Sequence, residues 1–128
     1  MSRWHLCALV ALATLVGCAS EIKRQPVELS AAAPERGQRF ATSQRVEFTL
    51  ESGYTRTIQA DTEFVVAGRI VQGLVLRPTQ TVLTVEGAHM HEAYAVLNDG
   101  RLVGFYLPVE HAFTALPLAT SFPLVERK

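Results

Sequence analysis

The feature that most limits the fold is a series of short segments in which apolar and polar residues alternate. In residues 45–50, RVEFTL, the apolar side chains of Val46, Phe48 and Leu50 alternate with charged or polar ones. A period of two places such side chains on one face of a strand. Further candidate strands, bounded by turn residues and rich in apolar or β-branched side chains, lie at 54–58, 62–68, 74–78, 81–86, 91–97 and 101–107. The chain is therefore predicted to be all-β.

The number and spacing of these segments predict how the strands associate. Six or seven short strands in about 70 residues are typical of an antiparallel meander. An open sheet of this size would leave long edges that favour aggregation. We therefore expect closure into a small barrel, SH3-like or similar, with a small sandwich as the alternative.

The tripeptide Asn98-Asp99-Gly100 lies between two apolar runs and is the strongest hairpin signal in the chain. A two-residue Asp-Gly loop fits it, and so does a type I turn with Gly100 at a bulge position. The two registers differ by one residue, and the sequence leaves both open.

The pattern weakens after Pro108. Residues 109–113, VEHAF, fit a helical turn or a 3₁₀ segment, and Pro117 and Pro123 interrupt the stretch that follows. Residues 115–128 are therefore predicted to be an extended C-terminal tail, and the folded β domain is predicted to span 44–114.

The bulk composition excludes several classes of protein. A length of 128 residues is enough for one domain. Twelve basic and 12 acidic residues give zero formal charge, without the basic excess typical of nucleic-acid-binding proteins. The two cysteines, Cys7 and Cys18, precede the predicted domain, so neither a disulfide nor a thiol nucleophile is expected within it.

The first 17 residues are typical of a secretory signal. Arg3 and the amino terminus provide a positive start, and residues 6–16 form an apolar core of 11 residues. That length suits a signal peptide and is too short for a membrane span.

The end of this segment, Leu15-Val16-Gly17-Cys18, resembles the lipobox of bacterial lipoproteins over about the first 20 residues. The resemblance implies cleavage before Cys18, a diacylglycerol on its thiol and acylation of the new amino terminus. Two or more acyl chains hold a protein stably in a bilayer. The alternative is an ordinary apolar cysteine after an ordinary signal or in a buried N-terminal helix.

The residues after the cysteine, Ala19 and Ser20, include no aspartate, which in this class often causes retention in the inner membrane. The resemblance therefore implies a lipid anchor in the outer membrane of a Gram-negative cell, with the domain in the periplasm. The bilayer, reached through acylated Cys18, is the first predicted partner.

Residues 18–43 are predicted to be a disordered, flexible tether. Pro26 and Pro34 interrupt any helix, and no period of 2 or 3.6 is sustained. A flexible chain of about 25 residues would span about 25–30 Å. The alternative is that part of this segment packs on the domain as an extra strand, with Phe40 buried.

His89 and His91 are a candidate metal site. Two residues apart on a strand, they would point to the same side. With Glu92, Glu110 or His111 they could bind zinc or copper. Two solvated histidines on an edge strand are the alternative, because no third ligand is fixed by spacing. No other cofactor is expected.

Tyr94 and Tyr106 are candidate partner-binding residues, since tyrosine is enriched in interface hot spots. The alternative is core packing with Tyr106 half-buried. The sequence offers no nucleophile elbow, paired acids or glycine-rich phosphate loop, so an enzyme is not expected.

These observations predict an outer-membrane lipoprotein with a non-catalytic protein-interaction or envelope-assembly domain. Its second partner would be an envelope protein, and no nucleic acid is expected. One alternative is a periplasmic metal or small-ligand binding protein that uses His89 and His91. A weaker alternative is an inhibitor of a wall-degrading enzyme.

Overall fold

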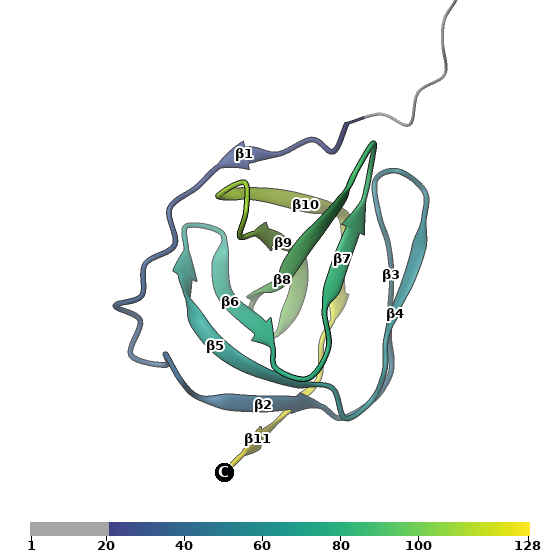
Figure 1. Cartoon of the computed structure of the whole chain (residues 1–128). Helices are drawn as coiled ribbons and strands as arrows, with labels where there is room; N and C mark the ends of the chain where they lie inside the picture. The colour runs from purple at the N-terminus through teal and green to yellow at the C-terminus, as the bar shows by residue number, and fades with distance from the viewer. Residues whose placement is uncertain (1–20) are drawn as a thin grey trace, which may run out of the picture.

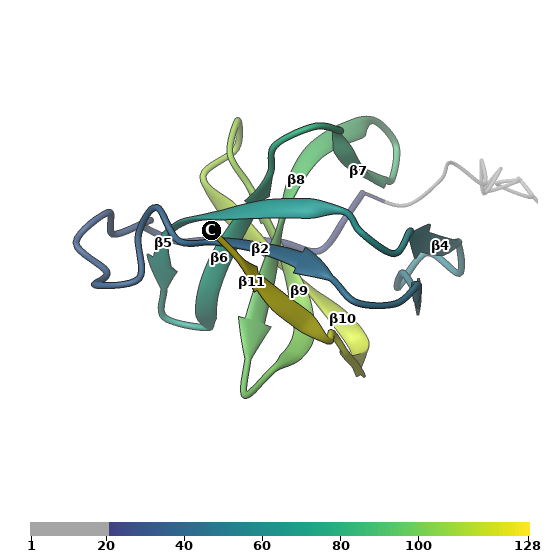
Figure 2. The same ribbon diagram turned by 90° about the horizontal axis from the view of Figure 1, so that it is seen from below.

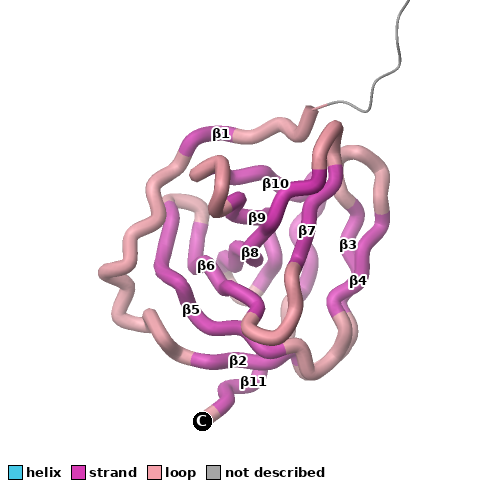
Figure 3. Tube along the Cα trace, in the orientation of Figure 1, coloured by secondary structure: helices cyan, strands magenta, loops and turns pink. Residues whose placement is uncertain are grey.

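A computed structural model describes residues 21–128 of the chain, and this part is all-β (Figure 1, Figure 3). Every strand pairing in it is antiparallel, which confirms the predicted fold class. Within residues 21–128, no helix has the length and apolar character needed to cross a membrane. The strands are β1 (Gln25–Pro26), β2 (Arg39–Thr42), β3 (Val46–Thr49), β4 (Thr55–Ile58), β5 (Glu63–Ile70), β6 (Gly73–Pro78), β7 (Leu83–Glu86), β8 (Met90–Asn98), β9 (Arg101–Leu107), β10 (Ala112–Ser121) and β11 (Leu124–Arg127).

The main sheet has the order β1-β10-β9-β8-β6-β5-β2-β11, with β7 beside β8 and β3–β4 as a separate hairpin. Only Phe122 and Pro123 separate β10 from β11. Because β10 pairs with β9 and β11 pairs with β2, one C-terminal stretch lies along both ends of the sheet (Figure 2). The hydrogen-bonded path itself stays open. The chain therefore joins the two ends of the sheet by covalent connection and not by strand pairing.

The main core lies inside the curl of this sheet. The apolar residues of the alternating segments point inward, as the period of two requires. Two aromatic pairs cross the core: the rings of Phe48 and Phe105 have centroids 5.2 Å apart, and those of Phe64 and Phe122 are 5.6 Å apart. The largest fully buried side chains include Phe64, Phe105, Phe122, Leu76, Leu102 and Leu107.

The hairpin between β8 and β9 has the two-residue loop. Asn98 pairs with Arg101, so Asp99 and Gly100 are the loop residues, with φ angles of 51° and 72°. Two positive φ angles are typical of a type I′ turn, which Asp-Gly favours. This settles the register that the sequence left open.

The loop gives a prediction for Gly100→Ala. Nothing lies within 4 Å of a Cβ built at Gly100, so only the backbone conformation opposes alanine. We expect the free energy of unfolding to fall by about 1–2 kcal/mol. Urea unfolding measures it, with Asp99→Asn as the control, because asparagine tolerates a positive φ. Equal stability of Gly100→Ala and the wild type would contradict the assigned turn.

The predicted tether is part of the folded domain wherever the structure describes it. Residues 39–42 form β2, between β5 and β11, and Ala41 and Thr42 are each 1% exposed. Upstream, Ser30 exchanges two backbone hydrogen bonds with Arg69, of 2.8 and 2.9 Å. The prediction of a flexible tether is therefore wrong for residues 21–43, and the alternative of an extra strand is correct. Phe40 itself is only half-buried.

The physical reason is a second apolar cluster on the outer face of the sheet. Its buried members are Ile70, Val75, Val96, Tyr106 and Phe113. Val27 and Leu29 pack against them from the N-terminal segment. Burial of this second face stabilises a segment whose own sequence pattern is too short to indicate structure.

The predicted C-terminal tail is also part of the sheet. Residues 112–121 form β10, 124–127 form β11, and Phe122 between them is 2% exposed. Pro117 lies where the register of β10 with β9 is interrupted, between Ala115 and Thr120. A proline is tolerated at such an irregularity, so the domain does not end at residue 114. The predicted helical turn near residue 110 is a turn that leads into β10.

Candidate functional site

Cys18 and the rest of the lipobox lie outside the described residues. The other predicted site residues, His89, His91, Tyr94 and Tyr106, lie on or beside β8 and β9. Two further places emerge from the structure alone, a pocket beside residues 21–23 and a groove between β3 and β10.

The two histidines occupy different environments. His91 is 8% exposed on β8, and its Nδ1 lies 2.6 Å from Oε1 of Glu110. His89 is exposed and precedes β8, in the turn after β7, so the strand geometry that would align the two rings does not apply. Within residues 21–128, no three His, Cys, Asp or Glu side chains form a group that could hold a metal ion. The predicted metal site thus has no third ligand here, and His91 is not the solvated histidine of the alternative.

The pKa of Glu110 reflects two opposed effects. Partial burial raises it, but hydrogen bonds from His91 and from the backbone, with the charges of His91 and Arg24, outweigh burial and lower the pKa. An ionised carboxylate only accepts hydrogen bonds, so Nδ1–H of His91 donates to Glu110. The pair joins β8 to the turn after β9.

We expect His91→Ala to act on stability and not on metal uptake. It leaves the half-buried carboxylate of Glu110 without its side-chain donor, so the free energy of unfolding should fall by about 1–3 kcal/mol at pH 7. Urea unfolding with and without zinc or copper tests this, with His89→Ala as the exposed control. Saturable metal binding that both substitutions abolish would instead support the metal site.

Glu110 should also contribute to the pH dependence of stability. Its folded-state pKa is lowered, so its contribution is present above the unfolded pKa of about 4.3 and is lost as pH falls through the folded value. Glu63, whose pKa is lowered chiefly by a hydrogen bond from Arg39, acts in the same direction. We expect the stability of Glu110→Gln to fall less than that of the wild type between about pH 5 and pH 3. Parallel pH profiles of the two proteins would contradict this role.

The two tyrosines form a cross-strand pair and not an exposed patch. Tyr94 and Tyr106 are opposite each other on β8 and β9, and their ring centroids are 6.2 Å apart. Tyr106 is 4% exposed and Tyr94 is half-buried. The pKa of each is raised, first by burial and then by a neighbour, Glu92 for Tyr94 and Tyr94 for Tyr106. The predicted partner-binding patch is therefore wrong for Tyr106, because the outer cluster that contains Val27 and Leu29 encloses it.

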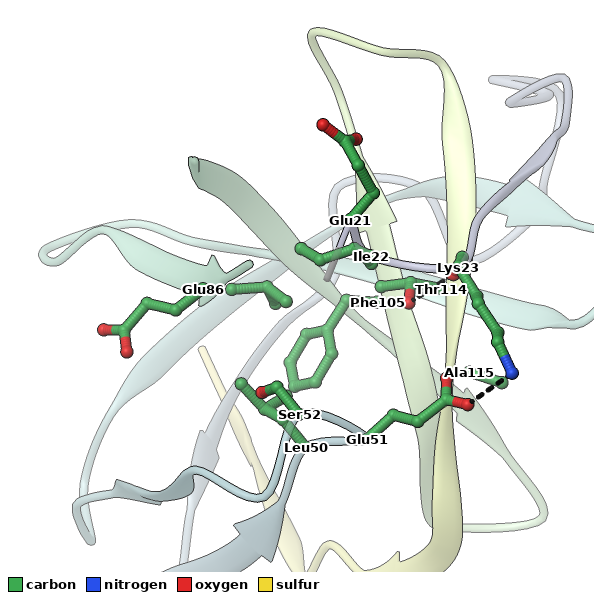
Figure 4. A pocket seen from close by; sticks show the side chains of 11 residues that line it. Glu21, Ile22, Lys23, Leu50, Glu51, Ser52, Glu86, Phe105, Thr114 and Ala115 are labelled. Carbon is green, nitrogen blue, oxygen red and sulfur yellow. Dashed lines mark hydrogen bonds and ion pairs between the residues drawn. The ribbon is translucent and has the colours of Figure 1, made fainter. Parts of the chain in front are cut away.

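A pocket of about 220 Å³ lies beside the first described residues (Figure 4). Its apolar lining includes Ile22, Leu50, Val85 and Phe105. At its rim, Nζ of Lys23 is 3.2 Å from Oε1 of Glu51. Ligand pockets are usually about 300–1,000 Å³, so this one is small. The remaining residues that line the pocket are Glu21, Ser52, Glu86, Thr114 and Ala115.

An open groove of about 500 Å³ runs between β3 and β10. Leu118, which lines it, is 77% exposed. Leu118 lies in the stretch where the register of β10 with β9 is interrupted. The sequence does not indicate this groove, because its pattern predicts a tail over residues 115–128. The remaining lining residues are Glu47, Phe48, Thr49, Thr55, Pro117 and Thr120.

Comparison of the chain with protein-family models, curated proteins and solved structures gives no match. We therefore infer the function from the N-terminal resemblance and from the geometry of the described residues.

Proposed function

We propose that this protein is an outer-membrane lipoprotein, anchored through acylated Cys18, whose β domain is a non-catalytic module that binds another envelope protein. The observation that carries the binding function is the groove between β3 and β10, with Leu118 exposed in it.

The groove has the features of a protein-binding surface. Full burial of a leucine side chain is worth about 1.5–3 kcal/mol, so a partner that covers Leu118 gains from it. Residues 116–119 have no pairing with β9 in the described structure, and we infer that an extended segment of a partner pairs with β10 there. Such segments bind by main-chain hydrogen bonds together with pockets for alternate side chains.

The charged groups near the pocket and on β8 support a non-catalytic module. Lys23 pairs with Glu51, Arg56 with Glu86 and His91 with Glu110. These pairs connect different elements of the domain, which gives each group a structural role.

Site-specific photo-cross-linking in intact cells tests the binding function. A photoreactive phenylalanine analogue replaces Leu118 in one variant and Val71 in the control, which is 88% exposed in the turn after β5. We expect position 118 to capture one reproducible envelope protein that position 71 does not capture. We also expect Cys18→Ala to reduce the capture.

The identity of the captured protein distinguishes the remaining functional hypotheses. A wall-degrading enzyme would favour the inhibitor. The same set of proteins at both positions, or none at position 118, would contradict binding through this groove.

A further inference from the structure

We propose that the end of the domain formed by the β3–β4 turn and the β7–β8 turn rests on the surface of the lipid bilayer that holds Cys18. This inference deepens the proposed function and rests on its acylated cysteine. It names the face of the domain that meets the lipid.

The chain is fixed to the domain from its first described residues. A Cβ at Gly87, in the β7–β8 turn, would lie 2.5 Å from Cγ1 of Ile22, so Ile22 packs directly on that turn. Oγ1 of Thr114 donates a 2.9 Å hydrogen bond to the carbonyl of Lys23. The ammonium of Lys23 pairs with Glu51 of the β3–β4 turn. Residues 22 and 23 are thus attached to both turns and to β10.

The covalent chain limits how far this end stands from the anchor. Four peptide bonds join Cys18 to Ile22, and a fully extended chain spans at most about 3.6 Å for each, or about 14 Å in all. This upper limit holds for any conformation of the chain. This limit is about half the reach of the 25-residue tether expected from the sequence. The end of the domain that holds Ile22 therefore stays close to the membrane.

The two turns present side chains that suit the lipid interface. Tyr54, at the end of the β3–β4 turn, is 53% exposed, and Met90, at the end of the β7–β8 turn, is 67% exposed. Tyrosine is enriched where proteins meet the bilayer interface. Figures 1 and 2 show both turns beside the start of the described chain, with the β5–β6 turn on the opposite side.

The charges at this end indicate the class of lipid. Glu21, Glu51 and Glu86 are balanced in part by Lys23 and Arg56. There is no basic cluster among these side chains to attract anionic headgroups. A zwitterionic surface, such as that of phosphatidylethanolamine or phosphatidylcholine, is therefore the partner that fits.

Fluorescence quenching by brominated lipid tests the proposal. The sole tryptophan, Trp4, lies in the predicted signal, so Tyr54→Trp gives the mature protein a single reporter. Val71→Trp, in the β5–β6 turn, is the matched control. In phosphatidylcholine vesicles that carry brominated chains, we expect the lipidated Tyr54→Trp protein to lose about half of its fluorescence, because interfacial rings lie close to the acyl chains. The Val71→Trp protein should lose little, and Met90→Trp provides a second reporter on the same end.

Flotation of the same vesicles separates the two proposals. If the protein floats with the vesicles and all three variants are quenched equally or not at all, the proposed contact of the two turns with the bilayer is wrong. The lipid anchor at Cys18 is then still supported. If the protein purified from membranes does not float, the anchor fails, and the orientation fails with it.

Discussion

Replacement of Gly68 by alanine is expected to lower the free energy of unfolding by about 3 kcal/mol and to detach the N-terminal segment from the sheet. Gly68 has a φ of 155°, and a Cβ there would lie 2.2 Å from the carbonyl oxygen of Ser30. Ser30 exchanges two backbone hydrogen bonds with Arg69, the residue that follows Gly68. The substitution therefore strains the backbone and separates Ser30 from β5 at the bridge between Ser30 and Arg69.

Amide hydrogen exchange distinguishes the loss of global stability from the local detachment of the N-terminal segment. The amides of Val27 and Ser30, which donate to His111 and Arg69, should lose protection in Gly68→Ala. The amide of Val96 in β8, between β6 and β9, should retain most of its protection. Gly37→Ala is the matched control, because φ is 89° there and nothing lies within 4 Å of its Cβ. It carries backbone strain without the clash. Unchanged protection at Ser30 in Gly68→Ala would show that the segment is not held in this way.

Phe105→Ala is expected to cost about 3–5 kcal/mol, the usual range for removal of a buried aromatic ring. Phe105 is 1% exposed, packs on Phe48 at 5.2 Å and forms part of the pocket beside Ile22. Its loss would open the core toward the end of the domain that carries the N-terminal segment.

Urea unfolding measures this cost, with Val71→Ala as a control that should change stability little because Val71 is 88% exposed. A loss below about 1 kcal/mol for Phe105→Ala would mean that the site collapses around the missing ring. That result would contradict the packing described here.

The strands of the inner core could be predicted from the sequence because alternation and turn residues agree there. Residues 46–49 and 55–58 pair as a hairpin, and Asp99-Gly100 forms the turn that its composition indicates. The two flanking segments could not be predicted, because their strands depend on surfaces made by distant residues. Val27 and Leu29 are ordered because they pack on the outer face of β5, β6, β8 and β9.

For the candidate sites too, local sequence indicates some residues, while contacts between distant segments determine the rest. Glu110 could be named as a neighbour of His91, but only the turn after β9 brings the two within 2.6 Å. The sequence leaves Tyr106 either in an exposed patch or half-buried, and no local pattern indicates that Val27 and Leu29 cover its face. The groove at Leu118 arises from a register interruption, which no local pattern determines.

The measurement that tests the central claim most directly is mass spectrometry of the N-terminal tryptic peptide from the outer-membrane fraction. Trypsin cleaves after Lys23, so the predicted peptide is Cys18–Lys23, CASEIK. The account predicts that this peptide begins at Cys18 and carries a diacylglycerol on its thiol and an acyl chain on its amino group. A peptide that starts elsewhere, or an unmodified Cys18, would contradict the anchor and every proposal built on it.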